Sequence, residues 1–192
     1  MTPRPRLSHD ARGSVSVEMA LAATVMVMLT AGAVELAYAF QQHSGAQTAV
    51  RHGARLASTL SPASSDLSLR SVADDPFDIT CSESGCSQGT LQSGLLRRVV
   101  FGPDDDGQCA ATARERRGMC DLYDGFEASD VSIRYQASGL GGLDASANPA
   151  PIITVTIAER PLQTVVLGPL LPGRFQRLPA VSASTMGEDL DG

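Results

Sequence analysis

The 192-residue sequence contains no lysine and no tryptophan, and only 4% of its residues are aromatic. With so few large rings, a folded core must be built mainly from aliphatic side chains. The net charge of -6 and the pI of about 5.0 disfavour nucleic acid as a partner, because phosphate binding needs clustered basic residues. At 20.0 kDa, the chain is long enough for one modest globular domain plus an appendage.

The sequence also lacks the motifs of catalytic and metal sites. GxSxG, Walker and Rossmann motifs are absent, as is any nucleophilic cysteine motif. The histidines His9, His43 and His52 do not have the i, i+4 spacing of a helical metal pair. The cysteines form neither a CxxC pair nor a Cys/His quartet. We therefore expect no enzymatic activity, no cofactor and no metal.

Proline is absent between Pro5 and Pro62. Because proline interrupts helices, residues 14–60 can form one long helix. Its first part, residues 19–40, is almost uncharged and is close to the ~20 residues that cross a bilayer. In its second part, small residues recur at three-and-four spacing, which predicts that this half leaves the membrane and docks on a globular domain. These residues are Ala46, Ala49, Val50, Gly53, Ala54 and Ala57.

The rest of the chain predicts an α+β fold with a C-terminal antiparallel sheet. Alternating and β-branched patterns indicate strands at residues 130–136, 152–158, 163–168 and 179–185. A short helical pattern spans residues 88–101, and turns or loops are expected at residues 61–68, 102–107 and 138–151. We divide the chain into residues 1–13, the helix of residues 14–60 and a domain of residues 61–192.

All four cysteines, Cys81, Cys86, Cys109 and Cys120, lie after the apolar run. If this part is outside the cytoplasm, they can form two disulfides, for which three connectivities exist. Pairing of sequence neighbours, Cys81 with Cys86 and Cys109 with Cys120, is favoured because short loops close most easily.

The segment before the apolar run is basic. Three arginines, Arg4, Arg6 and Arg12, precede Ser14, against one acid, Asp10. A basic head before an apolar run stays in the cytoplasm while the following chain crosses the membrane. We therefore expect a single span with the domain outside the cytoplasm.

Three interpretations of this N-terminal segment compete. In the first, it is a permanent single-span anchor. In the second, it is a secretory signal with a small-x-small cleavage site at residues 31–33 or 37–39. Against this, the apolar run exceeds the usual length of about 7–15 residues, and Glu35 lies within the cleavage region. In the third, the chain is cut after Gly13 on the cytoplasmic side and the helix is kept.

The third interpretation gives Glu18 a role. Cleavage after Gly13 creates a positive amine on Ser14, about one helical turn from the Glu18 carboxylate. In a bundle of parallel helices this carboxylate can also meet a neighbour's amine, and paired charges are tolerable in a low-dielectric setting where single ones are costly. Such a pair would set the register between subunits. Glu35 lies about 25 Å further along the helix, near the outer headgroups, where it need not be buried.

A glycine, four residues, a glutamate and a long apolar helix together resemble the class III signal of type IV pilin-like proteins. More narrowly, RGSVSVEMALAATVMVML with a second glutamate at Glu35 is similar to the TadE-like family, the minor pseudopilins of the tight-adherence (Flp-type) pilus. The specific part of the resemblance covers residues 12–56. Beyond it, only the architecture is similar.

The resemblance implies cleavage after Gly13 by a prepilin peptidase, with Ser14 as the mature N-terminus and Glu18 as the assembly glutamate. Glu35 matches the second glutamate of the family. The implied partners are membrane lipid, the prepilin peptidase, other pilins or pseudopilins and the pilus assembly platform. The implied location is the bacterial inner membrane, with the domain outside it or incorporated in a surface pilus. No enzymatic activity is implied.

Some positions depart from the family pattern. Met19 stands where an aromatic residue usually follows the first glutamate, and Ser14 is not the aromatic N-terminus common in major pilins. Thr24 and Val25 occupy a region in which proline is often found. These departures, and a domain too bulky to repeat in a thin fibre, favour a minor component. The alternative is a secreted or single-span membrane-anchored binding domain with no pilus role.

Overall fold

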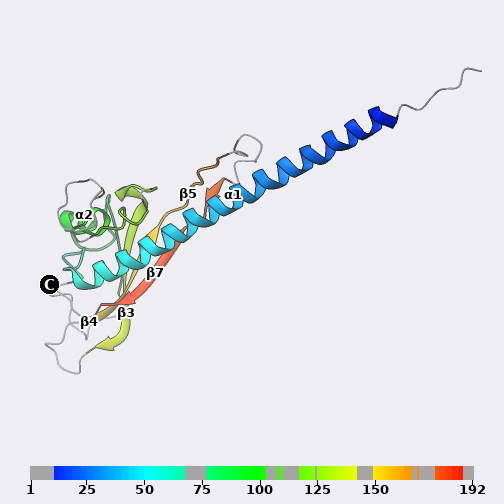
Figure 1. Cartoon of the computed structure of the whole chain (residues 1–192). Helices are drawn as coiled ribbons and strands as arrows, with labels where there is room; N and C mark the ends of the chain where they lie inside the picture. The colour runs from blue at the N-terminus through cyan, green and yellow to red at the C-terminus, as the bar shows by residue number, and fades with distance from the viewer. Residues whose placement is uncertain are drawn as a thin grey trace, which may run out of the picture.

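The computed structural model describes residues 11–67, 77–102, 107, 109, 117–123, 125–141, 149–165, 168 and 176–187. It is an α+β fold, as predicted, in which one long helix, α1 (Ala11–Thr59), precedes a domain with an antiparallel sheet. Figure 1 shows the first half of α1 projecting from the domain and the second half lying along the sheet.

The second half of α1 packs closely because its inward side chains are small. Ala46, Ala49 and Ala57 are fully buried and share one face of the helix. This face contacts β4 (Pro149–Ile157) and β7 (Val181–Met186). The docking predicted from the three-and-four spacing of small residues is therefore confirmed.

The main sheet has five antiparallel strands in the order β2-β1-β3-β4-β7. Its remaining strands are β1 (Asp78–Ser82), β2 (Gly85–Cys86) and β3 (Val131–Gly141). A second, two-stranded sheet pairs β5 (Arg160–Pro161) with β6 (Arg177–Leu178). The described residues also contain the helix α2 (Ser93–Phe101) and the 3-10 turn η2 (Ala128–Asp130).

Alternate residues of the central strands form the core. Ile133 lies opposite Val155, and Tyr135 lies opposite Ile153. All four side chains are fully buried, and they join the alanine face of α1 in one cluster. The Tyr135 hydroxyl accepts a hydrogen bond of 3.1 Å from the Ala63 N–H, which ties the chain after α1 to the sheet.

The central strands are longer than predicted. β3 continues to Gly141 and β4 begins at Pro149, so the loop expected at residues 138–151 is wrong at both ends. A register shift between Ala137 and Gly141 accommodates this irregular sequence within the ladder. The prediction for residues 179–185 is confirmed by β7.

The predicted strand at residues 163–168 is wrong. Residues 162–165 are in no strand, and residues 166–167 lie outside the described part of the chain. The N–H groups of Gln163 and Val165 bond to side chains on α1, which take the place of a neighbouring strand.

The helix expected at residues 88–101 is shorter than predicted, because α2 begins only at Ser93. Leu91 forms a bridge with Ser64, and Gly89 has a φ of 76°, a conformation that a right-handed helix excludes. Of the turn expected at residues 102–107, Gly102 and Gly107 are described, and both have positive φ.

Candidate functional site

Glu18, which the family resemblance implies is the assembly glutamate, lies on the projecting part of α1. Gly13 and Ser14 are in the first turn of this helix. Glu18 is exposed, as is every side chain from Val15 to Thr30. The Glu18 carboxylate is thus available to the surroundings of the helix and takes no part in packing on the domain.

Glu35 differs, because only 7% of its surface is exposed. Its carboxylate accepts the N–H of Val165, at 2.9 Å from Oε1 and 3.2 Å from Oε2. The expectation that Glu35 need not be buried is therefore wrong. The chain after β5 returns to α1 at the level of Glu35 and presents the Val165 backbone N–H to it. The resulting charge-assisted hydrogen bond offsets the cost of burying the carboxylate.

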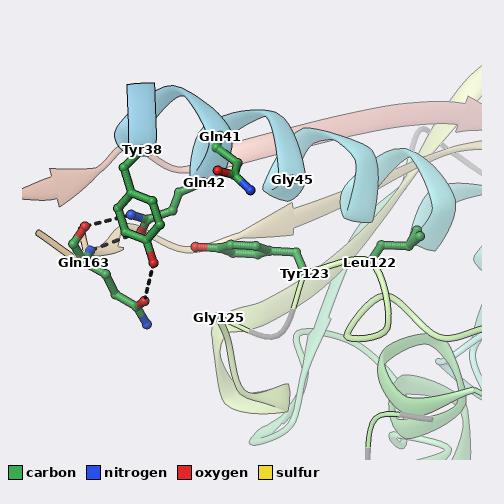
Figure 2. Close-up of a pocket in the computed structure, with 8 residues that line it drawn as sticks. All are labelled: Tyr38, Gln41, Gln42, Gly45, Leu122, Tyr123, Gly125 and Gln163. Atoms are coloured by element: carbon green, nitrogen blue, oxygen red, sulfur yellow. Dashed lines mark hydrogen bonds between the residues drawn. The ribbon is translucent and has the colours of Figure 1, made fainter. Parts of the chain in front are cut away.

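Gln42 repeats this arrangement about two turns further along α1. Its Nε2 donates to the carbonyl of Gln163 at 2.7 Å, and its Oε1 accepts the N–H of the same residue at 3.1 Å. Tyr38, between the two, donates its hydroxyl to Oε1 of Gln163 at 3.3 Å. We call Glu35, Tyr38 and Gln42 with their partners Gln163 and Val165 the clamp; Figure 2 shows its Tyr38 and Gln42 arms.

A cleft of about 270 Å³ lies beside the clamp, between α1 and the residues Leu122, Tyr123 and Gly125. Figure 2 shows the Tyr123 ring crossing this space below the helix. The guanidinium of Arg160 lies over the same ring, with Cζ 5.5 Å from its centroid, which is a cation–π arrangement. A Cβ at Gly45 would come within 3.1 Å of the ring, so a glycine there gives the ring room.

The described lining of the cleft consists of glutamine, tyrosine, glycine and leucine residues. The described residues that line the cleft include no acid, histidine or cysteine. Among the described residues of the whole chain, no group of three histidine, cysteine, aspartate or glutamate side chains could hold a metal ion. The arrangement fixes the position of the domain along the helix, and this is the role that its geometry supports.

Sequence reasoning singled out Glu35 but missed Tyr38 and Gln42. The available signal was their spacing, because polar groups at i, i+3 and i+7 share one face of a helix. That face continues the alanine face of the second half of α1. In the described part of the chain, hydrogen bonds from α1 to the domain are therefore present from Glu35 onward, within the first part of the helix, residues 19–40.

The cysteines lie in two disulfides, Cys81–Cys86 and Cys109–Cys120. This is the pairing of sequence neighbours that short loops favour. Cys81 in β1 lies directly opposite Cys86 in β2, so the first disulfide closes a hairpin at the edge of the sheet. Neither disulfide contains a residue of the clamp.

The N-terminal part of the chain is similar to a known protein family. Residues 13–55 match the family model described as TadE-like protein. The match covers Gly13, both helix glutamates and most of α1, and it ends before the sheet begins. It confirms the TadE-like resemblance of this segment. No curated protein and no solved structure matches the chain.

Proposed function

Because residues 13–55 match the TadE-like family, we propose that the chain is a non-enzymatic minor pseudopilin that takes part in assembly of a tight-adherence (type IVc) pilus. The family match is the observation that carries this proposal. Under it, the partners are membrane lipid, a prepilin peptidase, other pilins or pseudopilins and the assembly platform. The domain of residues 61–192 lies outside the bacterial inner membrane, and the N-terminus begins in the cytoplasm.

The exposed half of α1 supports this role. Its large side chains, such as Val25, Met26 and Leu29, are between 56% and 69% exposed. An apolar helix of this length is suited to crossing a bilayer or to packing against other helices. A carboxylate on such a surface requires a positive partner, and a neighbouring subunit's N-terminal amine meets this requirement.

Processing after Gly13 is part of the proposal. Glycine suits the cut, because it lets an extended chain fit a tight protease groove. Cleavage leaves the amine of Ser14 about one turn from Glu18.

The first test is the N-terminus of the chain isolated from its native cells, read by mass spectrometry of the terminal peptide. A chain that starts at Ser14 supports processing and the pseudopilin role. A chain that starts near Phe40 makes the helix a discarded signal and contradicts the proposal. An intact leader leaves a plain membrane anchor with no function for Glu18.

The second test is Glu18→Ala in the native host. We expect the variant to insert into the membrane normally and to impair incorporation into pili. Glu83→Ala, which removes an exposed acid between β1 and β2, is the matched control and should leave piliation unchanged. Wild-type piliation in Glu18→Ala would contradict the pairing of Glu18 with an amine.

A further inference from the structure

Large apolar side chains remain exposed beyond the point at which the domain first touches α1. Leu36 is 72% and Phe40 71% exposed, and their i, i+4 spacing puts them on one face of the helix. On the domain, Val165, whose N–H belongs to the clamp, is 59% exposed. We call Leu36, Phe40 and Val165 the tip.

The length of the apolar part of α1 sets the depth of the tip relative to the bilayer. The segment between the two acids of the helix, residues 19–34, contains no charged side chain. At 1.5 Å per residue it extends about 24 Å, close to the ~30 Å thickness of the hydrocarbon core, so Glu18 and Glu35 lie near the two boundaries of that core. Glu35, the first acid after Glu18, then lies at the boundary of this core. The Val165 N–H is 2.9 Å from the Glu35 carboxylate. Val165 therefore lies at the same boundary, although it is 130 residues away in the sequence.

We propose that the tip lies in the headgroup layer of the bilayer, so that the domain rests on the membrane surface through Val165 beside the helix. This inference depends on the membrane anchoring in the proposed function. It goes further, because it assigns a lipid-contacting residue to the domain. Phe40 is about 9 Å above Val34, still close to the polar layer that surrounds the hydrocarbon core.

Two features favour lipid over a second copy of the chain at the tip. First, three side chains offer far less than the roughly 800 Å² that each partner buries in a stable protein interface. Second, Tyr38 lies at the same level and donates its hydroxyl to Gln163, and tyrosine is enriched at the membrane–water boundary. The clamp also gives the Glu35 carboxylate a hydrogen-bond donor where a bare charge would be costly.

The absence of tryptophan makes the test direct, because one substitution introduces a single fluorophore. Three variants of the full chain are Val25→Trp in the middle of the apolar segment, Val165→Trp in the tip and Met186→Trp at the far end of β7. Met186 is 45% exposed and lies opposite Ile152, near the end of β4 that is remote from β5. Each variant is placed in vesicles of phosphatidylcholine and phosphatidylglycerol that carry a quencher on the headgroup or deep in the acyl chain.

We expect Val25→Trp to be quenched mainly by the acyl quencher, Val165→Trp mainly by the headgroup quencher and Met186→Trp by neither. If Val25→Trp is quenched and Val165→Trp is not, the domain stands clear of the bilayer and the inference is wrong, while the anchoring survives. If Val25→Trp is also unquenched, the anchoring itself fails, and with it the proposed function. Protection of Val165→Trp that grows with protein density would assign the tip to a second copy and overturn the lipid assignment.

Discussion

The two halves of α1 use apolar residues in opposite ways. In the projecting half, the large residues Val25, Met26 and Leu29 are exposed. In the docked half, the small residues Ala46, Ala49 and Ala54 are buried. A water-soluble helix would have the reverse distribution, because burying large side chains stabilises most.

The difference shows that one continuous helix serves two kinds of contact. The docked half needs small residues so that its backbone can approach β4 and β7. The projecting half has no need to fit the domain, and its large side chains are suited to lipid or to other helices. Glu35, Tyr38 and Gln42 lie at the boundary between the projecting half and the docked half. Four predictions test this division, beginning with the largest expected effect.

The same charge should have different consequences in the two halves. Ala49→Asp buries an unpaired carboxylate at a fully buried site, and we expect a loss of about 3–5 kcal/mol or more. Val25→Asp should leave the domain folded and instead weaken membrane insertion by about 2.5–3.5 kcal/mol. Protease resistance of the domain measures the first effect, and membrane fractionation measures the second. An unfolded domain in Val25→Asp would mean that the projecting half supports the fold.

Alkaline pH should lower the stability of the folded domain on which the docked half packs, because the buried Tyr135 becomes ionised. Burial raises the pKa of Tyr135 to about 12, although the hydrogen bond from Ala63 acts in the opposite direction. In the unfolded chain the pKa is about 10, so the neutral phenol favours the folded state, and this stability is lost as the pH rises from about 10 to about 12. The total loss is about 3 kcal/mol. Thermal unfolding monitored across this pH range measures it.

Tyr135→Phe is the control for this pH dependence. The variant should be less stable near neutral pH, because the Ala63 N–H loses its acceptor, and its stability should vary less between pH of about 10 and 12. The chain contains no lysine to titrate in the same window. An unchanged slope in Tyr135→Phe would assign the alkaline transition to another group.

Removing the Glu35 carboxylate should detach the domain from the boundary between the two halves. Glu35→Ala leaves the Val165 N–H without its acceptor, and we expect a cost of about 1.5–3 kcal/mol. Faster hydrogen exchange of the Val165 amide is the measurement. Glu35→Gln keeps an oxygen acceptor and should restore part of the protection, whereas Glu18→Ala should leave it unchanged. Equal exchange in Glu35→Ala and the unaltered chain would show that the clamp does not hold this segment.

Much of this division could be predicted from the sequence, because it depends on local patterns. The absence of proline up to Pro62 gave one uninterrupted helix, which ends at Thr59. The spacing of Ala46, Ala49 and Val50 identified the docked face, and β-branched alternation identified β3 and β4. In each case the signal lies within a few turns or a few residues of the element that it describes.

The clamp could not be predicted in this way, because its bonds join residues that are 121, 125 and 130 residues apart. Gln163 and Val165 lie in a sequence with strand character, but their N–H groups are bonded by Gln42 and Glu35. β1 was missed for a related reason: only Ile79 and Cys81 mark its buried face, which is too short a pattern to recognise. Tertiary contacts decided the structure of both segments.

The smallest expected effect comes from adding one methyl group to each half of α1. A Cβ at Gly53 would overlap the Met119 sulfur, whereas a Cβ at Gly32 has nothing within 4 Å. Gly53→Ala should therefore cost about 1–3 kcal/mol through overpacking, reduced to the extent that Met119 can shift. Gly32→Ala should stabilise the helix by roughly 0.5–1 kcal/mol, because alanine has the higher helix propensity. Thermal unfolding of both variants in the same detergent gives the comparison. Effects of the same sign and size would show that the two halves of α1 are packed alike, which contradicts the division from which these predictions start.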